Sequence, residues 1–159
     1  MKRFIWKTLQ IIELSFTIIT DKNIKLTNND IEKLDKKLDD ILLDSIEDEV
    51  DISTSEFDEG GFYCENEFKA NEKVEIYSKI IYKIDIRGKC SNNHYTTYDI
   101  LNDFEINEKS CISNINKSKL ISELSMLPII GKYIQKDSIF ISISKVDINR
   151  MQLKDVELL

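Results

Sequence analysis

The residues best suited to chemistry in this sequence are carboxylates, and they are crowded into one part of the chain. Between Asp30 and Glu67 there are fifteen acidic residues and three lysines, a net charge of −12. The rest of the chain has fourteen acidic and nineteen basic residues, a net charge of +5. A surface built from the first part would attract cations or a basic protein.

These carboxylates do not form a recognisable metal site. Asp44 with Asp48, or Glu65 with Glu67, would supply the oxygen ligands that Mg²⁺ and Ca²⁺ prefer. However, the sequence has neither the spacing of an EF-hand loop nor a two-metal arrangement with basic residues that grip a substrate. It also lacks GxGxxG and Walker A motifs, since only four glycines are present. We therefore predict no metal ion and no cofactor.

A single histidine and three cysteines are the other candidates for catalysis. His94 could act as a general base oriented by Asp99, but spacing places no serine or cysteine nucleophile beside it. The cysteines are Cys64, Cys90 and Cys111; without a CxxC pair they indicate neither a zinc site nor a disulfide framework. We predict no catalytic residues and no enzymatic activity. A small hydrolase or nuclease that uses His94 is the weakest alternative.

A helix is predicted to position the first acidic residues. Thr27 fits an N-cap, and Asp30 fits the acid of a capping box. Apolar residues then recur every three or four positions, as on the core-facing side of a helix. They are Ile31, Leu34, Leu38, Ile41, Leu42 and Ile46. We expect Asp44 and residues 47–49 near the C-terminal end of this helix, where no base follows and the macrodipole disfavours negative charge.

Alternating apolar and polar residues predict the strands. The clearest run is Val74 to Arg87, and a longer one is Phe4 to Ile18, with a bend near Thr8 to Gln10 where inward positions become polar. Residues 50–57, 62–68, 95–106 and 138–148 form the other predicted strands. Gly60 and Gly61 are predicted to be a flexible point, residues 88–93 a loop, and residues 117–127 a second helix stopped by Pro128.

The resulting element order is β-α-β-β-β-β-α-β, which favours the α+β class with a mainly antiparallel sheet and two helices packed on one face. The length favours a single domain over residues 1–159. At the N-terminus, Lys7 and Glu13 interrupt the apolar run before it could serve as a signal peptide or span a bilayer. An odd number of cysteines without a framework fits a reducing cytoplasm.

The acidic segment, residues 39–59, is predicted to be a binding surface. Asp39 to Glu49 holds six carboxylates in eleven residues, about one per 3 Å of helix, within a factor of two of duplex DNA. A net charge of −7 and a pI of about 4.9 argue against direct binding of nucleic acid or an anionic membrane. The predicted contact residues are Asp39, Asp40, Asp44, Glu47, Asp48, Glu49, Asp51, Glu56, Asp58, Glu59 and Tyr63.

Acidity of this character is similar to that of small phage or mobile-element inhibitors of host defence nucleases, and of immunity proteins against nuclease toxins. The sequence therefore favours a non-enzymatic inhibitor that docks its acidic segment on a basic, nucleic-acid-binding groove of a partner. One alternative is a structural or assembly subunit, in which strands 4–18 and 74–87 pair across protomers. Another is a solvated face that only keeps the protein soluble.

Overall fold

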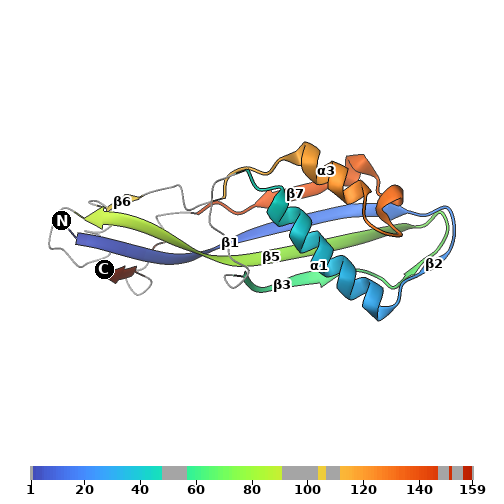
Figure 1. Ribbon diagram of the computed structural model, residues 1–159, viewed down its shortest axis with the longest axis horizontal. Helices are drawn as coiled ribbons and strands as arrows, with labels where there is room; N and C mark the ends of the chain where they lie inside the picture. The colour runs from blue at the N-terminus through green and yellow to red at the C-terminus, as the bar shows by residue number, and fades with distance from the viewer. Residues whose placement is uncertain are drawn as a thin grey trace.

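Two long strands that lie side by side organise the fold (Figure 1). This computed structural model describes residues 2–47, 57–90, 104–106, 112–146, 151 and 156–158. Strand β1 covers Lys2–Ile19 and strand β5 covers Lys73–Cys90. They pair antiparallel in one unbroken register along their whole length. At about 3.3 Å per residue, each of these 18-residue strands extends roughly 60 Å.

Shorter strands flank the long pair on both sides. The order across the main sheet is β3-β5-β1-β7, with β6 beside β5 and β8 beside β1, and a second small sheet joins β2 to β4. Their bounds are β2 Ile24–Lys25, β3 Phe57–Tyr63, β4 Glu67–Phe68, β6 Phe104–Ile106, β7 Phe140–Ile143 and β8 Val156–Leu158. Every pairing among the described strands is antiparallel.

Two α-helices cover one face of this sheet (Figure 1). Helix α1 spans Asn28–Asp44 and helix α3 spans Lys117–Ser125. Two short 3₁₀ helices follow α3, η3 at Gly131–Tyr133 and η4 at Lys136–Ser138. The predicted α+β class, with a mainly antiparallel sheet and helices packed against it, is confirmed.

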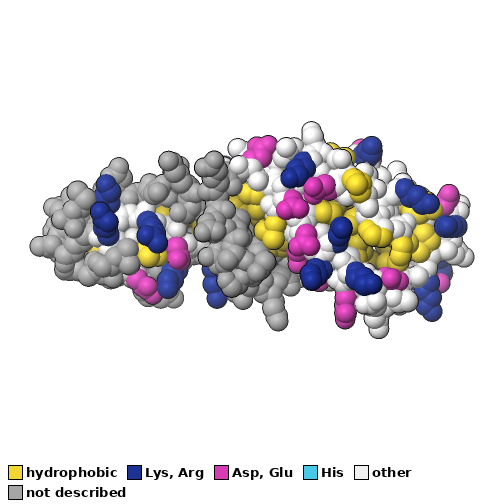
Figure 2. All heavy atoms as spheres, viewed as in Figure 1, with side chains coloured by type: hydrophobic (Ala, Val, Ile, Leu, Met, Phe, Trp, Pro, Cys, Tyr) yellow, Lys and Arg dark blue, Asp and Glu magenta, His cyan; other side chains and the backbone are white. Residues whose placement is uncertain are grey.

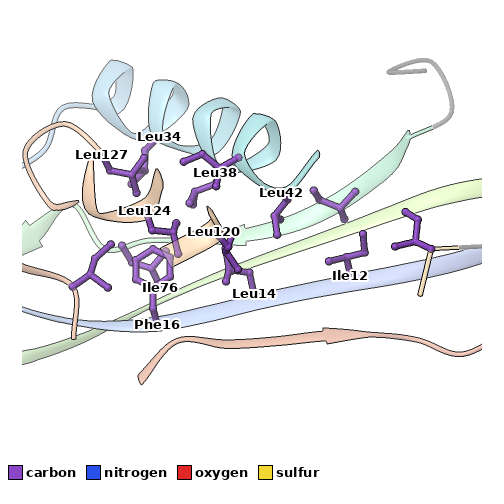
Figure 3. Packing of buried hydrophobic residues seen from close by; sticks show 14 of the residues in the cluster. Ile12, Leu14, Phe16, Leu34, Leu38, Leu42, Ile76, Leu120, Leu124 and Leu127 are labelled. Carbon is purple, nitrogen blue, oxygen red and sulfur yellow. The ribbon is translucent and has the colours of Figure 1, made fainter. Parts of the chain in front are cut away.

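The core lies between the helices and the two long strands (Figure 3). The inward positions of β1 and β5 whose side chains the structure describes are buried, as their alternation predicted, apart from the half-buried Thr8. Figure 3 shows Leu34, Leu38 and Leu42 of α1 and Leu120 and Leu124 of α3 facing Ile12, Leu14, Phe16 and Ile76. Burying one such side chain completely is worth about 1.5–3 kcal/mol, so this contact fixes the helices on the sheet.

One fully buried inward position of β1 is polar. The Gln10 side chain is 1% exposed, and its amide donates to the carbonyls of Ile112 and Ser144, both at 3.0 Å. Its oxygen accepts the Ile112 N–H at 2.8 Å. The sequence predicted a bend here, but pairing with β5 continues without a shift in register. Segments 102 and 134 residues away satisfy the polar group instead.

Several element boundaries differ from the prediction. The predicted flexible pair, Gly60 and Gly61, lies inside β3, where the register against β5 shifts between Asp58 and Gly61. Such a bulge accommodates an extra residue within a strand. Residues 88–90 continue β5 and do not form a loop. The predicted strand 62–68 is divided between the end of β3 and β4. The alternation did not predict β2 or β8, because strands of two or three residues show too little of it. Residues 50–56 and 95–103 lie outside the described residues.

The assembly alternative relied on β1 and β5 pairing across protomers. In the structure these two strands are each other's partners, from Lys2 opposite Cys90 to Ile19 opposite Lys73. Exchange between protomers would have to break that whole ladder. The alternative stays a prediction, and it would now have to use the strands that flank the long pair, β3 and β6 on one side or β7 and β8 on the other.

Candidate functional site

Helix α1 carries the first residues of the acidic segment, and its start is fixed by a capping box. The Thr27 hydroxyl accepts the Asp30 N–H at 3.1 Å, and the Thr27 N–H donates to Asp30 Oδ2 at 2.9 Å. This confirms the predicted cap. Because the apolar side of α1 is buried on the sheet as well, the helix gives its charged residues a rigid support.

The end of α1 differs from the prediction and corrects it. The helix stops at Asp44 with Ser45 as C-cap, so Glu47 lies beyond the helix. The Asn116 N–H at the start of α3 donates to the Ser45 carbonyl at 2.8 Å. Lys119 Nζ donates to the Asp44 carbonyl at 2.9 Å. A base distant in sequence therefore compensates the C-terminal end of α1, which the sequence left without one.

Two sides of α1 carry the charges, and they face different neighbours. The strand flank (Ile31, Asp35 and Asp39) lies toward β3 and β4, because Ile31 lines a depression together with Tyr63 and Glu65. Asp35 and Asp39 follow Ile31 at steps of four residues, so they share its side of the helix. The loop flank (Lys33, Lys37, Asp40 and Asp44) lies on the opposite side. Lys33, Lys37 and Asp40 there line a cavity with Pro128–Ile130.

On the strand flank, Asp39 is partly buried. Burial, and then the charges of Asp35 and Asp40, raise the pKa of the Asp39 carboxyl from 3.8 to about 6. Burial also raises the pKa of Asp35. Ionising either carboxyl is harder here than in water, because part of its hydration is lost, and at Asp39 like charges also lie close by. Asp39 is therefore poorly placed as an exposed contact.

On the loop flank, Asp40 and Asp44 are exposed, and so is Glu47 just beyond the helix. Lysines lie between the acidic side chains on the face shown in Figure 2. The only ion pair among the described residues is elsewhere, between Lys7 and Glu157 at 3.1 Å. These three carboxylates thus form no ion pair with the described lysines, although they share a surface with them.

The other predicted acidic contacts are only partly placed. Asp48, Glu49, Asp51 and Glu56 lie outside the described residues. Asp58 and Glu59 belong to β3, but their side chains are outside the description. Of the ten predicted acidic contacts, Asp40, Asp44 and Glu47 are exposed on the last part of α1 and just beyond it, whereas Asp39 is partly buried.

Tyr63, the predicted aromatic contact, ends β3 and is 57% exposed. Its hydroxyl donates to the Glu65 carboxylate at 3.3 Å. Phe68 is 1% exposed and Phe62 packs against the core, as their alternation predicted. Among the aromatic side chains that the structure describes in residues 62–68, Tyr63 is the one open to a partner.

Of the histidine and the three cysteines considered for catalysis, the structure describes the side chain of Cys64 alone. Burial, and then the Glu65 carboxylate, raise the pKa of the Cys64 thiol from 9.0 to about 11, which disfavours the reactive thiolate. His94, Asp99 and Cys111 lie outside the described residues, as does the side chain of Cys90. No group of three or more His, Cys, Asp or Glu side chains that could hold a metal ion occurs in the described parts of the chain.

Sequence reasoning missed two contributors to this surface, Lys119 and the turn at Pro128–Ile130. Neither carries a local signal, since a lone lysine and a Pro-Ile-Ile run are common in any sequence.

Comparisons with protein-family models, curated proteins and solved structures found no match to this chain. Within the described residues, no helix is long and apolar enough to cross a membrane.

Proposed function

We propose that this protein is a small, non-enzymatic binding protein whose acidic segment docks on a basic, nucleic-acid-binding groove of a partner protein in the cytoplasm. The partner's groove would be blocked by charge mimicry. The protein would thus act as an inhibitor of the antidefence or immunity type.

One observation carries the proposal. Asp40, Asp44 and Glu47 are exposed at one end of a helix that a capping box, a leucine core and Lys119 hold in place. In sequence, Asp48, Glu49 and Asp51 follow directly. Carboxylates on a rigid support lose little conformational entropy when they meet a basic surface, so more of their attraction is retained in the complex.

The lysines on the loop flank limit the extent of the acidic surface. Lys33, Lys36 and Lys37 all precede Asp39, so the contact should be centred on the end of α1 and on the residues after it. Tyr63 lies on the strand flank beside Ile31, so it would act as an aromatic anchor only for a partner that also reaches that side of α1.

The test starts by capturing partners from a lysate of the native host at low salt and eluting them with a salt step. The affinity of the captured partner is then measured for wild type and for Asp40→Asn/Asp44→Asn/Glu47→Gln. We expect the triple variant to bind about tenfold or more weakly, mainly through slower association. A matched control, Glu72→Gln/Glu75→Gln/Asp85→Asn, removes three exposed charges elsewhere and should bind like wild type.

Two further measurements make the proposal falsifiable. Binding should weaken as salt is raised, because exposed charges are screened, and an oligonucleotide that the partner binds should compete. If affinity is independent of salt, or if both triple variants lose the same affinity, charge mimicry by this surface is wrong.

A further inference from the structure

A cavity of about 340 Å³ lies between the loop flank of α1 and the turn that follows α3. We call it the α1 pocket. Its apolar lining residues are Leu26, Leu34, Pro128, Ile129 and Ile130. Ligand pockets in proteins range from about 300 to 1,000 Å³ and are mostly apolar with a few polar groups, so this cavity has the size and lining of a site for a small ligand.

The turn that forms one wall of the pocket is held in place. The Ile130 N–H donates to the Pro128 carbonyl at 2.7 Å, and the Gly131 N–H donates to the Leu127 carbonyl at 3.1 Å. Gly131 lies so close to the end of α3 that an added Cβ would be 2.6 Å from the Ser125 carbonyl oxygen. The wall is therefore fixed before any ligand arrives.

Ile129 is the unusual residue of this turn. Its φ is 69°, in the left-handed region that β-branched residues rarely adopt. Its side chain is 48% exposed and lines the pocket. The fold thus maintains an unfavourable backbone conformation that places an isoleucine at the mouth of an apolar cavity.

The charged residues of the pocket are unequal in number and in availability. Lys33, Lys36 and Lys37 line it from α1, where lysine stems can cover apolar surface while their ammonium groups stay in water. Of the two carboxylates, Asp30 is engaged by Thr27, and those hydrogen bonds hold its pKa below the usual value. A lowered pKa keeps the Asp30 carboxylate ionised, so the pocket sets three lysines against two aspartates. The rim therefore carries a formal net charge of +1.

We propose that the α1 pocket binds a small anionic amphiphile, an acyl chain with one terminal carboxylate. The chain would lie on Leu34, Ile129 and Ile130, and the carboxylate would lie among the three lysine ammonium groups. This proposal does not depend on the proposed function.

The probe is octanoate at concentrations where it is monomeric, with octanol and octylamine as ligands of matched chain length. Binding is followed by calorimetry and by NMR of isoleucine and leucine methyl groups. We expect octanoate to bind most tightly and octylamine least. Shifts should be concentrated on Leu34, Ile129 and Ile130.

Variants separate the head group from the chain. Lys36→Gln/Lys37→Gln should weaken octanoate binding about fivefold and leave octanol binding unchanged. Lys22→Gln/Lys25→Gln removes two lysines outside the pocket and should change neither. Ile129→Gly relieves the left-handed backbone and removes one wall, so it should weaken binding of both ligands without lowering the melting temperature.

Several results would overturn the proposal. Equal affinity for octanoate and octylamine would show that the rim charge does not select the ligand. Shifts away from the pocket would place the site elsewhere. Binding to phosphatidylglycerol vesicles without binding to monomeric octanoate would make the exposed turn a membrane contact. If none of the three ligands binds, the cavity is not a site for a small amphiphile. A side chain of a protein partner would then be its remaining candidate occupant.

Discussion

The two flanks of α1 place the same residue type in different environments. Asp39, on the strand flank, is partly buried and has a pKa of about 6. Asp40 is its neighbour in sequence, but it lies on the loop flank, where it is exposed and borders the α1 pocket. One step along a helix turns the side chain by about 100°, which is enough to move a carboxylate from one side of the helix to the other.

This difference shows that a high density of charge along the sequence does not by itself produce one charged surface on the folded protein. The acidic segment has a high linear density, but α1 divides its first members between two sides. The strand flank makes carboxylates harder to ionise, whereas the loop flank leaves them exposed. A partner would therefore meet Asp40, Asp44 and Glu47 together, and Asp39 only marginally.

The largest expected effect comes from removing a core side chain beneath α1, because that core supports both flanks of the helix. Leu38 is fully buried between α1 and the sheet. Leu38→Ala is expected to lower the free energy of unfolding by about 2–5 kcal/mol, because the deleted methyl groups leave a cavity. Urea denaturation measures the change. Leu43→Ala, on the outer side of the same helix, should cost much less; equal losses would mean that α1 is not anchored through Leu38.

The second prediction compares the two flanks through the pH dependence of stability. The Asp39 carboxyl binds protons more tightly in the folded state, with a pKa of about 6 against 3.8. Folded protein therefore holds more protons than unfolded protein between these pH values, and stability should fall as pH rises from about 4 to 6. Asp39→Asn should flatten this part of the profile and raise the unfolding free energy at pH 8 by about 1 kcal/mol, after allowance for the exposed part of the group.

The matched control is Asp44→Asn on the loop flank. It removes an equal charge from an exposed position, so the stability profile between pH 4 and 6 should keep its slope. Thermal denaturation at several pH values provides the data. A slope that survives in Asp39→Asn but disappears in Asp44→Asn would reverse the assignment of the two flanks.

The smallest expected effect concerns the end of α1. Lys119→Gln removes the ammonium group that donates to the Asp44 carbonyl. We expect a loss of about 0.3–1 kcal/mol at low salt, and less at high salt, since the macrodipole contribution is screened. Lys117→Gln is the control on the same helix. If both variants lose equal stability, the contact with Asp44 does not stabilise the helix end.

Local signals were sufficient for the longest elements. Thr27 and Asp30 predicted the start of α1 because a capping box involves only four consecutive residues. Alternation predicted β1 and β5, whose described inward residues are mostly buried, as expected. These features depend on neighbours in sequence, so a single chain was enough to find them.

The arrangement of the candidate site depended on contacts between distant residues. Lys119 contacts Asp44 although 75 positions separate them in the sequence. The Pro128–Ile130 turn borders the same cavity as α1, from which about 90 positions separate it. No pattern in the sequence marks such pairs. The predicted end of α1 was wrong for the same reason: the residues that replace its last hydrogen bonds belong to the segment before α3.

The position of β1 also has a consequence for biosynthesis. It pairs with β5, β7 and β8, and Gln10 is bonded to residues 112 and 144, so every partner of β1 is synthesised later than β1 itself. Translation adds about 5–20 residues per second, so the isoleucine-rich strand β1 would remain without its last partner strands for on the order of ten seconds. Folding should accordingly be slow for a chain of this size, and nascent chains stalled before residue 140 should be prone to aggregate.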